Sequence, residues 1–333
     1  MLLLIFPAID SSRLQSIQDA APGLDIVNAQ TLKQANEVMP DADAFYGKMT
    51  QQLLSKSRQL QWIQCPTASL EHYLFPELIE HPVILTNMRG LFSDVIADQV
   101  MGYVVMLARN LHLYRDRQRS RRWAPVGNSD AKTDFDQAPG TLTPVDQSHR
   151  HLADCVMGIF GVGEIGSEVA RRAVGFGLKI LGVDPHPRSI PGSLKMCWDL
   201  DRLEEMLHKS DFIVIAAPHT PRTENLFDHR LFGQMKNDAY LINIGRGAIV
   251  NSDDLAEALE AKEIAGAALD VFDEEPLAES HPLWDMENVI ITPHIAAASG
   301  RVPERHLELL CENVRRFNDG DDLLNRVDKE SWY

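Results

Sequence analysis

Three residue types that can act together on a carbonyl group follow three successive apolar segments late in the sequence. Arg246 stands between two glycines, Glu275 precedes a proline, and His294 follows one. A guanidinium can grip a carboxylate and a neighbouring carbonyl with two parallel hydrogen bonds. An imidazole can give or take the proton that carbonyl reduction or alcohol oxidation requires, and a carboxylate can hold its ring. Taken singly, His294 is equally well an ordinary loop histidine, but the three together predict acid–base chemistry on a small keto acid.

A glycine-rich segment earlier in the chain predicts a nucleotide site. Gly161, Gly163 and Gly166 have the spacing G-x-G-x-x-G and directly follow the apolar run 156–160. The first glycine permits a tight turn, the second lets the backbone approach a pyrophosphate, and the third lets helix and strand pack closely. The unpaired N–H groups and the positive dipole end of the following helix then favour phosphate.

An acidic residue indicates which dinucleotide this site takes. Asp184 follows the apolar run 179–183 and lies 18 residues after Gly166, close to the ~20 expected for a ribose-binding carboxylate. It would accept hydrogen bonds from the 2′-hydroxyl and repel the 2′-phosphate of NADP, so NAD is the predicted cofactor. Arg188 nearby could soften that preference. The alternative interpretation is a glycine-rich turn followed by a solvated aspartate.

Alternating apolar runs and helix-like segments supply the elements that would position these residues. This alternation predicts parallel sheets with helices on both faces. The carboxyl ends of parallel strands share one sheet edge, so Arg246, Glu275 and His294 are expected to lie close together there. Ligands of open α/β sheets bind at this edge. Five strands are predicted in the first part of the chain, at 2–6, 25–27, 42–46, 62–64 and 83–85. Six more, in the dinucleotide-binding pattern, are predicted at 155–160, 179–183, 212–217, 239–244, 265–271 and 289–292.

Three longer segments complete the pattern. Apolar periodicity predicts a single helix of more than four turns over 96–114, and an amphipathic helix over 304–317. The segment 118–152 is rich in Pro, Gly, Asp and Ser and is too long for an ordinary connection. It is interpreted as a lid, a subunit arm or a disordered insertion.

Composition narrows the class of protein. The 333 residues leave room for two domains. A formal net charge of −16 argues against a nucleic-acid partner, because that affinity comes from clustered Lys and Arg. No apolar run reaches the ~18 residues of a membrane helix, and the apolar run at 1–6 is too short for a signal peptide. The four cysteines have no metal-ligand spacing, so we expect no metal site and a cytoplasmic protein with reduced thiols.

As a set, these motifs resemble the D-isomer-specific 2-hydroxyacid dehydrogenases, which include glyoxylate/hydroxypyruvate reductases and D-lactate and D-3-phosphoglycerate dehydrogenases. The resemblance covers nearly the whole chain. It implies an α/β protein with two doubly wound parallel-sheet domains. A Rossmann NAD-binding domain, residues 99–295, would be inserted into a flavodoxin-like substrate domain, residues 1–98 and 296–333. The segments that carry the resemblance are 161–166, 217–223, 243–247, 270–277 and 293–297.

The resemblance also implies roles for individual residues. Arg246, Glu275 and His294 would form a catalytic trio that interconverts a small 2-keto acid and its D-2-hydroxy acid. Asp270 would bind the nicotinamide carboxamide, and the protein would be a homodimer formed through its NAD domains. Further cofactor contacts are implied for Glu164, Ile165, Ala217, Thr223 and Ile244.

The sequence departs from the family pattern at two places. The loop that grips the substrate carboxylate usually contains glycine, but here residues 65–70 read C-P-T-A-S-L, which leaves backbone N–H groups as the donors. The segment 118–152 is also longer than the family needs. The alternative function is an NAD-sensing binding protein, like the family's transcriptional corepressors, and a turnover assay separates the two.

Overall fold

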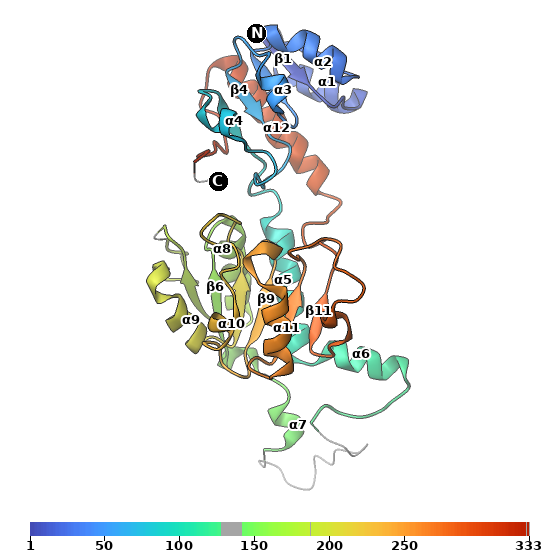
Figure 1. Cartoon of the computed structure of the whole chain (residues 1–333), viewed down its shortest axis with the longest axis vertical. Helices are drawn as coiled ribbons and strands as arrows, with labels where there is room; N and C mark the ends of the chain where they lie inside the picture. Colours follow the sequence, from blue (N-terminus) through green and yellow to red (C-terminus); the bar gives the residue numbers. More distant parts are fainter. Residues whose placement is uncertain (128–141, 187, 331, 333) are drawn as a thin grey trace. The chain divides into compact units, whose positions relative to one another are not determined.

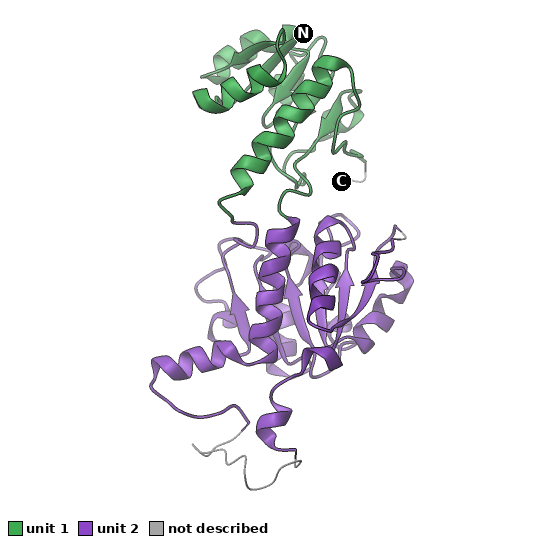
Figure 2. Cartoon of the chain, turned by 180° about the vertical axis from the view of Figure 1, so that it is seen from behind, with its two compact units in different colours: residues 1–92, 299–333 green, residues 93–298 purple. Residues whose placement is uncertain are grey.

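The computed structural model describes residues 1–127, 142–186, 188–330 and 332. The chain folds into two compact units (Figure 2). Unit 1 comprises residues 1–92 and 299–333, and unit 2 comprises residues 93–298. The domain boundaries expected from the sequence lay at 98/99 and 295/296. A single helix runs unbroken from Ser93, so its first turn belongs with the rest of that helix in unit 2.

Unit 1 is built on a five-stranded parallel sheet with the order β2-β1-β3-β4-β5, which confirms the predicted strands. Side chains of alternating residues pack on opposite faces of the sheet. Leu3 and Ile5 pack with one set of helices and Leu4 with the other. The strands are β1 (Leu2–Ile5), β2 (Asp25–Asn28), β3 (Ala44–Tyr46), β4 (Trp62–Gln64) and β5 (Ile84–Thr86).

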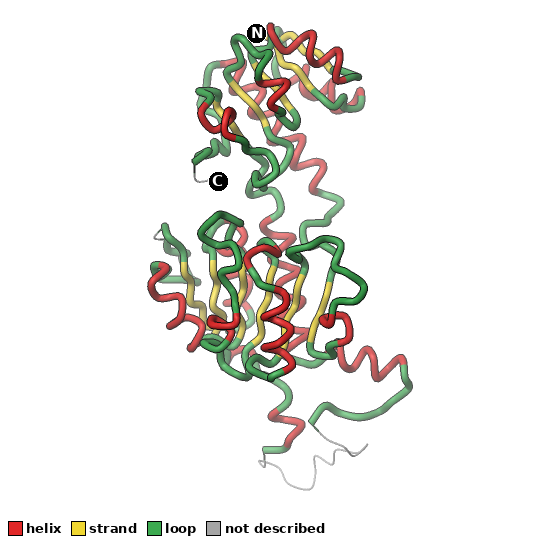
Figure 3. The backbone as a smooth tube through the Cα atoms, in the orientation of Figure 1, coloured by secondary structure: helices red, strands yellow, loops and turns green. Residues whose placement is uncertain are grey.

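Helices cover both faces of this sheet (Figure 3). Helices α1 (Ser11–Ala20) and α12 (Val302–Asp319) share one apolar core. Helices α2 (Leu32–Val38), α3 (Gln51–Leu54) and α4 (Pro76–Glu80) share the other. The helix predicted over 304–317 is therefore confirmed as α12.

Unit 2 is built on a six-stranded parallel sheet with the order β11-β10-β9-β8-β6-β7, again as predicted. Helices α5 (Ser93–Ala108) and α8 (Glu164–Gly175) cover one face (Figure 1), and α9 (Leu203–Lys209), α10 (His229–Phe232) and α11 (Ser252–Glu260) cover the other. The strands are β6 (Val156–Phe160), β7 (Lys179–Val183), β8 (Phe212–Ile215), β9 (Tyr240–Asn243), β10 (Gly266–Leu269) and β11 (Val289–Ile291). The two-sheet α/β fold class predicted from the sequence is confirmed.

The single helix predicted over 96–114 is wrong, because the structure breaks it into α5 and α6 (Leu111–Arg119). Asn110 adopts a left-handed conformation with φ 55°, which asparagine tolerates better than most residues. A distant segment stabilises the break. The Asn110 side chain donates to the Ser148 carbonyl at 2.6 Å, and the Arg150 N–H donates to the Ala108 carbonyl at 2.9 Å. Apolar periodicity carries no information about such a returning segment.

The rest of the long connection 118–152 is only partly described. The short helix α7 (Pro144–Gln147) begins with a capping box formed by Thr143 and Asp146. Residues 128–141, on which most of the lid, arm or insertion hypothesis depends, lie outside the described residues. Short 3₁₀ helices lie at Met39–Asp41, Leu152–Asp154, Leu200–Arg202, Gly247–Ile249 and Pro282–Asp285. None of the described helices is long and apolar enough to span a bilayer.

Candidate active site

The loops with the three predicted acid–base residues leave neighbouring strands of the unit 2 sheet. Strand β10 lies between β9 and β11, and Leu269 pairs with Asn243 on one side and Ile291 on the other. These three residues end their strands in one row. Arg246 and His294 follow that row by three residues and Glu275 by six. The sheet therefore brings all three loops to its carboxyl-terminal edge, as expected from the sequence.

Arg246 is held by the turn that carries it. The Asn243 side chain accepts a hydrogen bond from the Gly245 N–H at 3.1 Å and donates to the Arg246 carbonyl at 3.1 Å. The Arg246 guanidinium donates to the Gly245 carbonyl at 2.7 Å through Nη1, and the residue is half-buried. The buried Asn243 thus orients the backbone from which the guanidinium projects.

Gly247 fixes the distance between the first two of these loops. A Cβ at this position would lie 1.7 Å from the Phe272 carbonyl carbon and 2.3 Å from the Asp273 nitrogen. Any side chain would push the loop after β9 away from the loop after β10. The second glycine around Arg246 is therefore a packing requirement.

Glu275 and His294 form a hydrogen-bonded pair. The Glu275 Oε1 accepts from the Phe272 N–H at 3.0 Å, which orients the carboxylate. Its Oε2 lies 2.8 Å from Nδ1 of His294. An ionised carboxylate can only accept, so Nδ1 is the donor and Nε2 is the ring nitrogen that remains for a ligand. Both side chains are partly exposed, at 36% and 49%, so a ligand can reach this pair.

Asp270 holds the backbone on either side of His294. His294 has a left-handed φ of 51°, and its N–H donates to the Asp270 carbonyl at 2.8 Å. The Asp270 carboxylate accepts from the N–H groups of Ile295 at 3.0 Å and Ala296 at 2.9 Å, and from the Thr292 hydroxyl at 2.5 Å. Asp270 is 2% exposed. In this structure its carboxylate is committed to shaping the histidine loop.

The glycine-rich loop after β6 fits the pyrophosphate of a dinucleotide. A Cβ on Gly161, whose φ is 92°, would lie 2.5 Å from the Ala217 nitrogen, and one on Gly166 would lie 2.1 Å from the Gly161 carbonyl oxygen. A Cβ on Gly163 would meet nothing within 4 Å, so the space above this residue is open. Gly163 caps α8 without a side-chain hydrogen bond. The first N–H groups of α8 therefore face an open approach suited to phosphate.

Asp184 is tied to this loop from the end of β7. Its Oδ2 accepts from the Val162 N–H and its Oδ1 from the His186 N–H, both at 2.8 Å. The residue is 8% exposed. Each carboxylate oxygen has a second lone pair, which leaves acceptors for a ribose hydroxyl.

The other residues expected to contact the cofactor lie at the same sheet edge. Glu164 and Ile165 open α8, Ala217 follows β8, and Ile244 follows β9. Thr223 uses its hydroxyl within its own turn, donating to the Pro218 carbonyl at 2.9 Å. Within the described part of the chain, no group of three or more His, Cys, Asp or Glu side chains is placed to hold a metal.

In unit 1, the loop 65–70 after β4 is anchored through its carbonyl groups. The Pro66 carbonyl accepts from Nε2 of His306 at 2.9 Å, and the Ala68 carbonyl accepts from the Asn87 side chain at 2.8 Å. The Cys65 carbonyl accepts from Gln64 at 3.1 Å and the Thr67 carbonyl from the Met88 N–H at 3.0 Å. Since a trans peptide directs its N–H opposite its C=O, the amides of residues 67–69 point away from these anchors.

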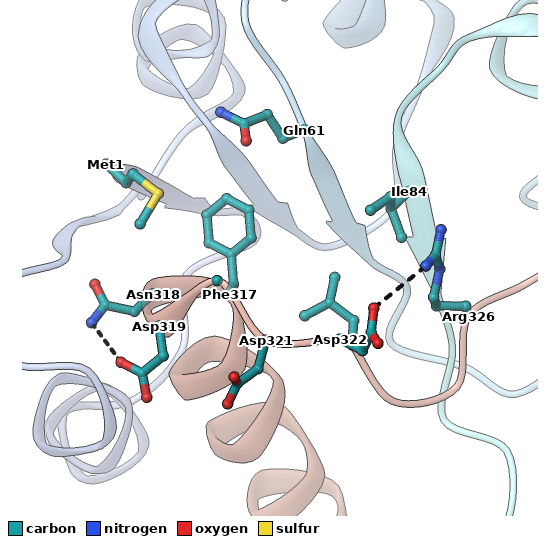
Figure 4. A pocket seen from close by; sticks show the side chains of 11 residues that line it. Met1, Gln61, Ile84, Phe317, Asn318, Asp319, Asp321, Asp322 and Arg326 are labelled. Carbon is teal, nitrogen blue, oxygen red and sulfur yellow. Dashed lines mark hydrogen bonds and ion pairs between the residues drawn. The ribbon is translucent and has the colours of Figure 1, made fainter.

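A pocket in unit 1 lies at the opposite end of the strands (Figure 4). Its lining includes Met1, Gln61 and Ile84, which stand at the amino-terminal ends of β1, β4 and β5. Asp322 there pairs with Arg326 at 3.9 Å. Ligands of open α/β sheets bind at the carboxyl ends of strands, so this pocket is not the candidate site.

Sequence reasoning missed two residues connected to the histidine loop. Thr292 donates to Asp270, and its Oγ1 lies 2.5 Å from the hydroxyl of Tyr103 on α5. The available signal was a tyrosine in the middle of an apolar helical stripe, together with a threonine two residues before the histidine. Neither position falls within a recognised motif.

Comparisons with known proteins identify the family to which the chain belongs. Residues 101–296 match the family model described as D-isomer specific 2-hydroxyacid dehydrogenase, NAD binding domain. A glyoxylate reductase from Thermococcus gammatolerans is 40% identical over 254 residues, which is 76% of this chain and 72% of the relative.

Solved structures extend the likeness over both units. A D-isomer specific 2-hydroxyacid dehydrogenase from Xanthobacter autotrophicus Py2, in complex with NADPH and MES, is similar with a TM-score of 0.79 and 26% identity, covering 100% of this chain and 99% of that one. D-lactate dehydrogenase from Aquifex aeolicus, complexed with NAD and lactic acid, gives 0.72 and 25% identity, covering 98% and 99%. The chain therefore belongs to the D-isomer specific 2-hydroxyacid dehydrogenase family of NAD(P)-dependent oxidoreductases.

Proposed function

We propose that this enzyme interconverts a small 2-keto acid and its D-2-hydroxy acid, with NAD(H) as cofactor. His294 is the acid and base, Glu275 orients its ring, and Arg246 binds the substrate carboxylate and carbonyl. The observation that carries the proposal is the 2.8 Å contact between His294 Nδ1 and Glu275, formed by the loops after β11 and β10, with the Arg246 loop on the next strand. When bound, the nicotinamide supplies or accepts the hydride.

The geometry suits these roles. With Nδ1 donating to Glu275, Nε2 of His294 is directed toward a ligand and can give a proton to the carbonyl oxygen during reduction. The same nitrogen, unprotonated, takes the proton from the hydroxyl during oxidation. The Glu275 carboxylate holds the ring in the orientation that this proton transfer needs. A guanidinium beside the carbonyl would stabilise the negative charge that develops on its oxygen.

The NAD preference rests on Asp184. Both carboxylate oxygens are held by backbone N–H groups at 2.8 Å, so the charge cannot easily swing away from a bound ribose. A 2′-phosphate carries about −2 charge near neutral pH and would be repelled. The relative from Xanthobacter binds NADPH and that from Aquifex binds NAD, so the family accommodates both and local charge must decide.

The loop 65–70 is proposed to bind the substrate carboxylate through backbone N–H groups. Its carbonyls are occupied by His306, Asn87, Gln64 and the Met88 N–H. The amides of residues 67–69 are therefore presented as a set, although glycine is absent. Unit 1 would thus be the substrate domain, and unit 2, which contains the matched NAD-binding segment, would form the interface of a cytoplasmic homodimer. Light scattering measures that dimer directly.

A steady-state screen tests the function. Glyoxylate, hydroxypyruvate, pyruvate and oxaloacetate are each assayed with NADH and with NADPH. We expect reduction of at least one acid, with a higher kcat/KM for NADH, and Asp184→Ser should narrow the cofactor preference. Tight NADH binding without turnover of any acid would favour the NAD-sensing alternative. Equal kcat/KM for NADH and NADPH would contradict the role proposed for Asp184. The proposed roles of His294, Glu275 and Arg246 would stand.

A further inference from the structure

A chain of two hydroxyl groups, with buried residues at both ends and the half-buried Thr292 between them, leads from helix α5 to the histidine loop. The Tyr103 hydroxyl lies 2.5 Å from Thr292 Oγ1, which donates to Asp270 Oδ1 at 2.5 Å. Tyr103 is 2% exposed, and so is Asp270. Tyr103 and Thr292 stand 189 positions apart in sequence. Tyr103 lies on α5 and Thr292 directly follows β11, so the two hydroxyls connect this helix to the carboxyl-terminal edge of the unit 2 sheet.

The direction of the protons in this chain follows from chemistry. An aspartate carboxylate can only accept, so the single hydroxyl proton of Thr292 is given to Asp270. The Thr292 oxygen must then accept, which makes Tyr103 the donor. Burial raises the pKa of Tyr103, so the hydroxyl stays protonated and able to donate across the working range of pH.

Asp270 is the point at which this chain meets the reacting residue. Its carboxylate binds the N–H groups of Ile295 and Ala296, and its carbonyl binds the N–H of His294. His294 is held at φ 51°, a left-handed conformation that is strained for a residue with a Cβ and persists only where the surroundings enforce it. A carboxylate that rotates would release both amides and let the loop relax.

We propose that Tyr103 is a positioning residue for the reaction: through Thr292 it fixes the rotation of the Asp270 carboxylate, which holds His294 in its left-handed conformation with Nε2 directed to the substrate. The inference rests on the proposed role of His294. Tyr103 touches neither substrate nor cofactor in this scheme. Its effect should therefore appear in the rate of the chemical step and not in binding.

Removing single hydroxyl groups tests the chain. Tyr103→Phe should lower kcat for keto-acid reduction roughly tenfold, because small displacements of a reacting group are costly. KM for the keto acid and the Kd for NADH, measured by fluorescence titration, should change by less than about twofold, the scatter expected of an unaffected site. Thr292→Val should lower kcat at least as much, and Thr292→Ser should restore it. The double variant should be no slower than Thr292→Val, because residues in series are not additive.

Tyr240→Phe is the matched control, because Tyr240 is a half-buried tyrosine of unit 2 that stands at the amino-terminal end of β9, away from the loops at the carboxyl-terminal edge of the sheet. It should keep native kcat. Native kcat in Tyr103→Phe, or additive effects in the double variant, would overturn the inference. If Tyr103→Phe does not fold, Thr292→Val against Thr292→Ser decides alone. If His294→Ala keeps its turnover, the proposed function fails. If His294→Ala loses turnover but Tyr103→Phe and Thr292→Val keep native kcat, the inference about Tyr103 fails and the proposed function stands.

Discussion

The loop after β11 and the loop after β4 both leave the carboxyl end of a parallel strand, and buried or half-buried polar groups anchor both. The loop after β11 is anchored by the Asp270 carboxylate, which accepts hydrogen bonds from backbone N–H groups of the loop. The loop after β4 is anchored by donors such as His306 and Asn87, which donate hydrogen bonds to its carbonyl groups. In the proposed function, the first loop thereby offers a side chain, that of His294, for chemistry, and the second offers backbone N–H groups for binding the substrate.

The two loops differ in which substitutions they tolerate. The first loop depends on one side chain, so a substitution there should abolish the chemistry. In the proposed function the second loop binds through backbone N–H groups, which every residue except proline carries. A loop side chain that anchors nothing, such as that of Ala68, can therefore vary while the anchors cannot. Substitutions at the first loop should therefore have larger effects on kcat and KM than substitutions at the second.

The largest effect should come from His294→Ala. The change removes the proposed proton donor, and a positioned acid or base contributes roughly 10²–10⁴ in kcat. Steady-state kinetics of keto-acid reduction measure the loss, with NADH binding as a check on folding. His208→Ala, at an exposed histidine of α9, is the control and should keep native kcat. Near-native turnover of His294→Ala would refute the assignment.

Arg246→Ala should act on both kinetic constants. The guanidinium is expected to bind the carboxylate in the ground state and the carbonyl oxygen in the transition state, so KM should rise and kcat should fall, with a loss of about 10² or more in kcat/KM. Arg222→Ala, at an exposed arginine of the same unit, serves as control. A change in KM alone would limit Arg246 to substrate binding.

Glu275→Gln should have a smaller effect, roughly tenfold in kcat for reduction. Glutamine keeps an acceptor for Nδ1 of His294 but removes the negative charge beside the ring. The loss should appear in kcat, while KM for the keto acid stays within about twofold of native, as steady-state kinetics measure. The neighbouring Glu274→Gln should keep native kcat. Native kcat in Glu275→Gln would leave the carboxylate a purely steric role.

The smallest effects should come from the loop after β4. His306→Ala removes one donor anchor, worth about 1 kcal/mol, so KM for the keto acid should rise about fivefold with kcat nearly native. His72→Ala, at an exposed histidine of unit 1, is its control. Ala68→Ser lies within the loop itself and should change KM by less than about twofold, because only the backbone at this position is used. A larger effect of Ala68→Ser than of His306→Ala would reverse the comparison.

The strands of both sheets were predicted from the sequence, because a strand buried on both faces is a short continuous apolar run whose ends are marked by polar residues. The Arg246, Glu275 and His294 loops were likewise placed together, since parallel strands share one carboxyl edge. Residue type and strand ends are local properties, and the sequence states them directly.

Contacts between distant segments were not predictable in the same way. The break at Asn110 depends on the returning segment at Ser148 and Arg150. The hydroxyl chain depends on Tyr103 meeting Thr292 across the fold. The anchors of the loop after β4 come from positions as remote as His306. Each is a tertiary contact with no periodic signature.

The adjacency of β9, β10 and β11, in sequence as in space, affects how such a protein can be recombined. Residues 240–296 form one uninterrupted piece of the gene that encodes Arg246, Glu275 and His294, and the close approach at Gly247 is internal to it. Exchanging that piece between homologues would transfer the proposed acid–base residues together, while the proposed substrate loop and ribose carboxylate stayed with the recipient. Tyr103 would also stay with the recipient, so a crossover has to preserve a compatible hydroxyl on α5.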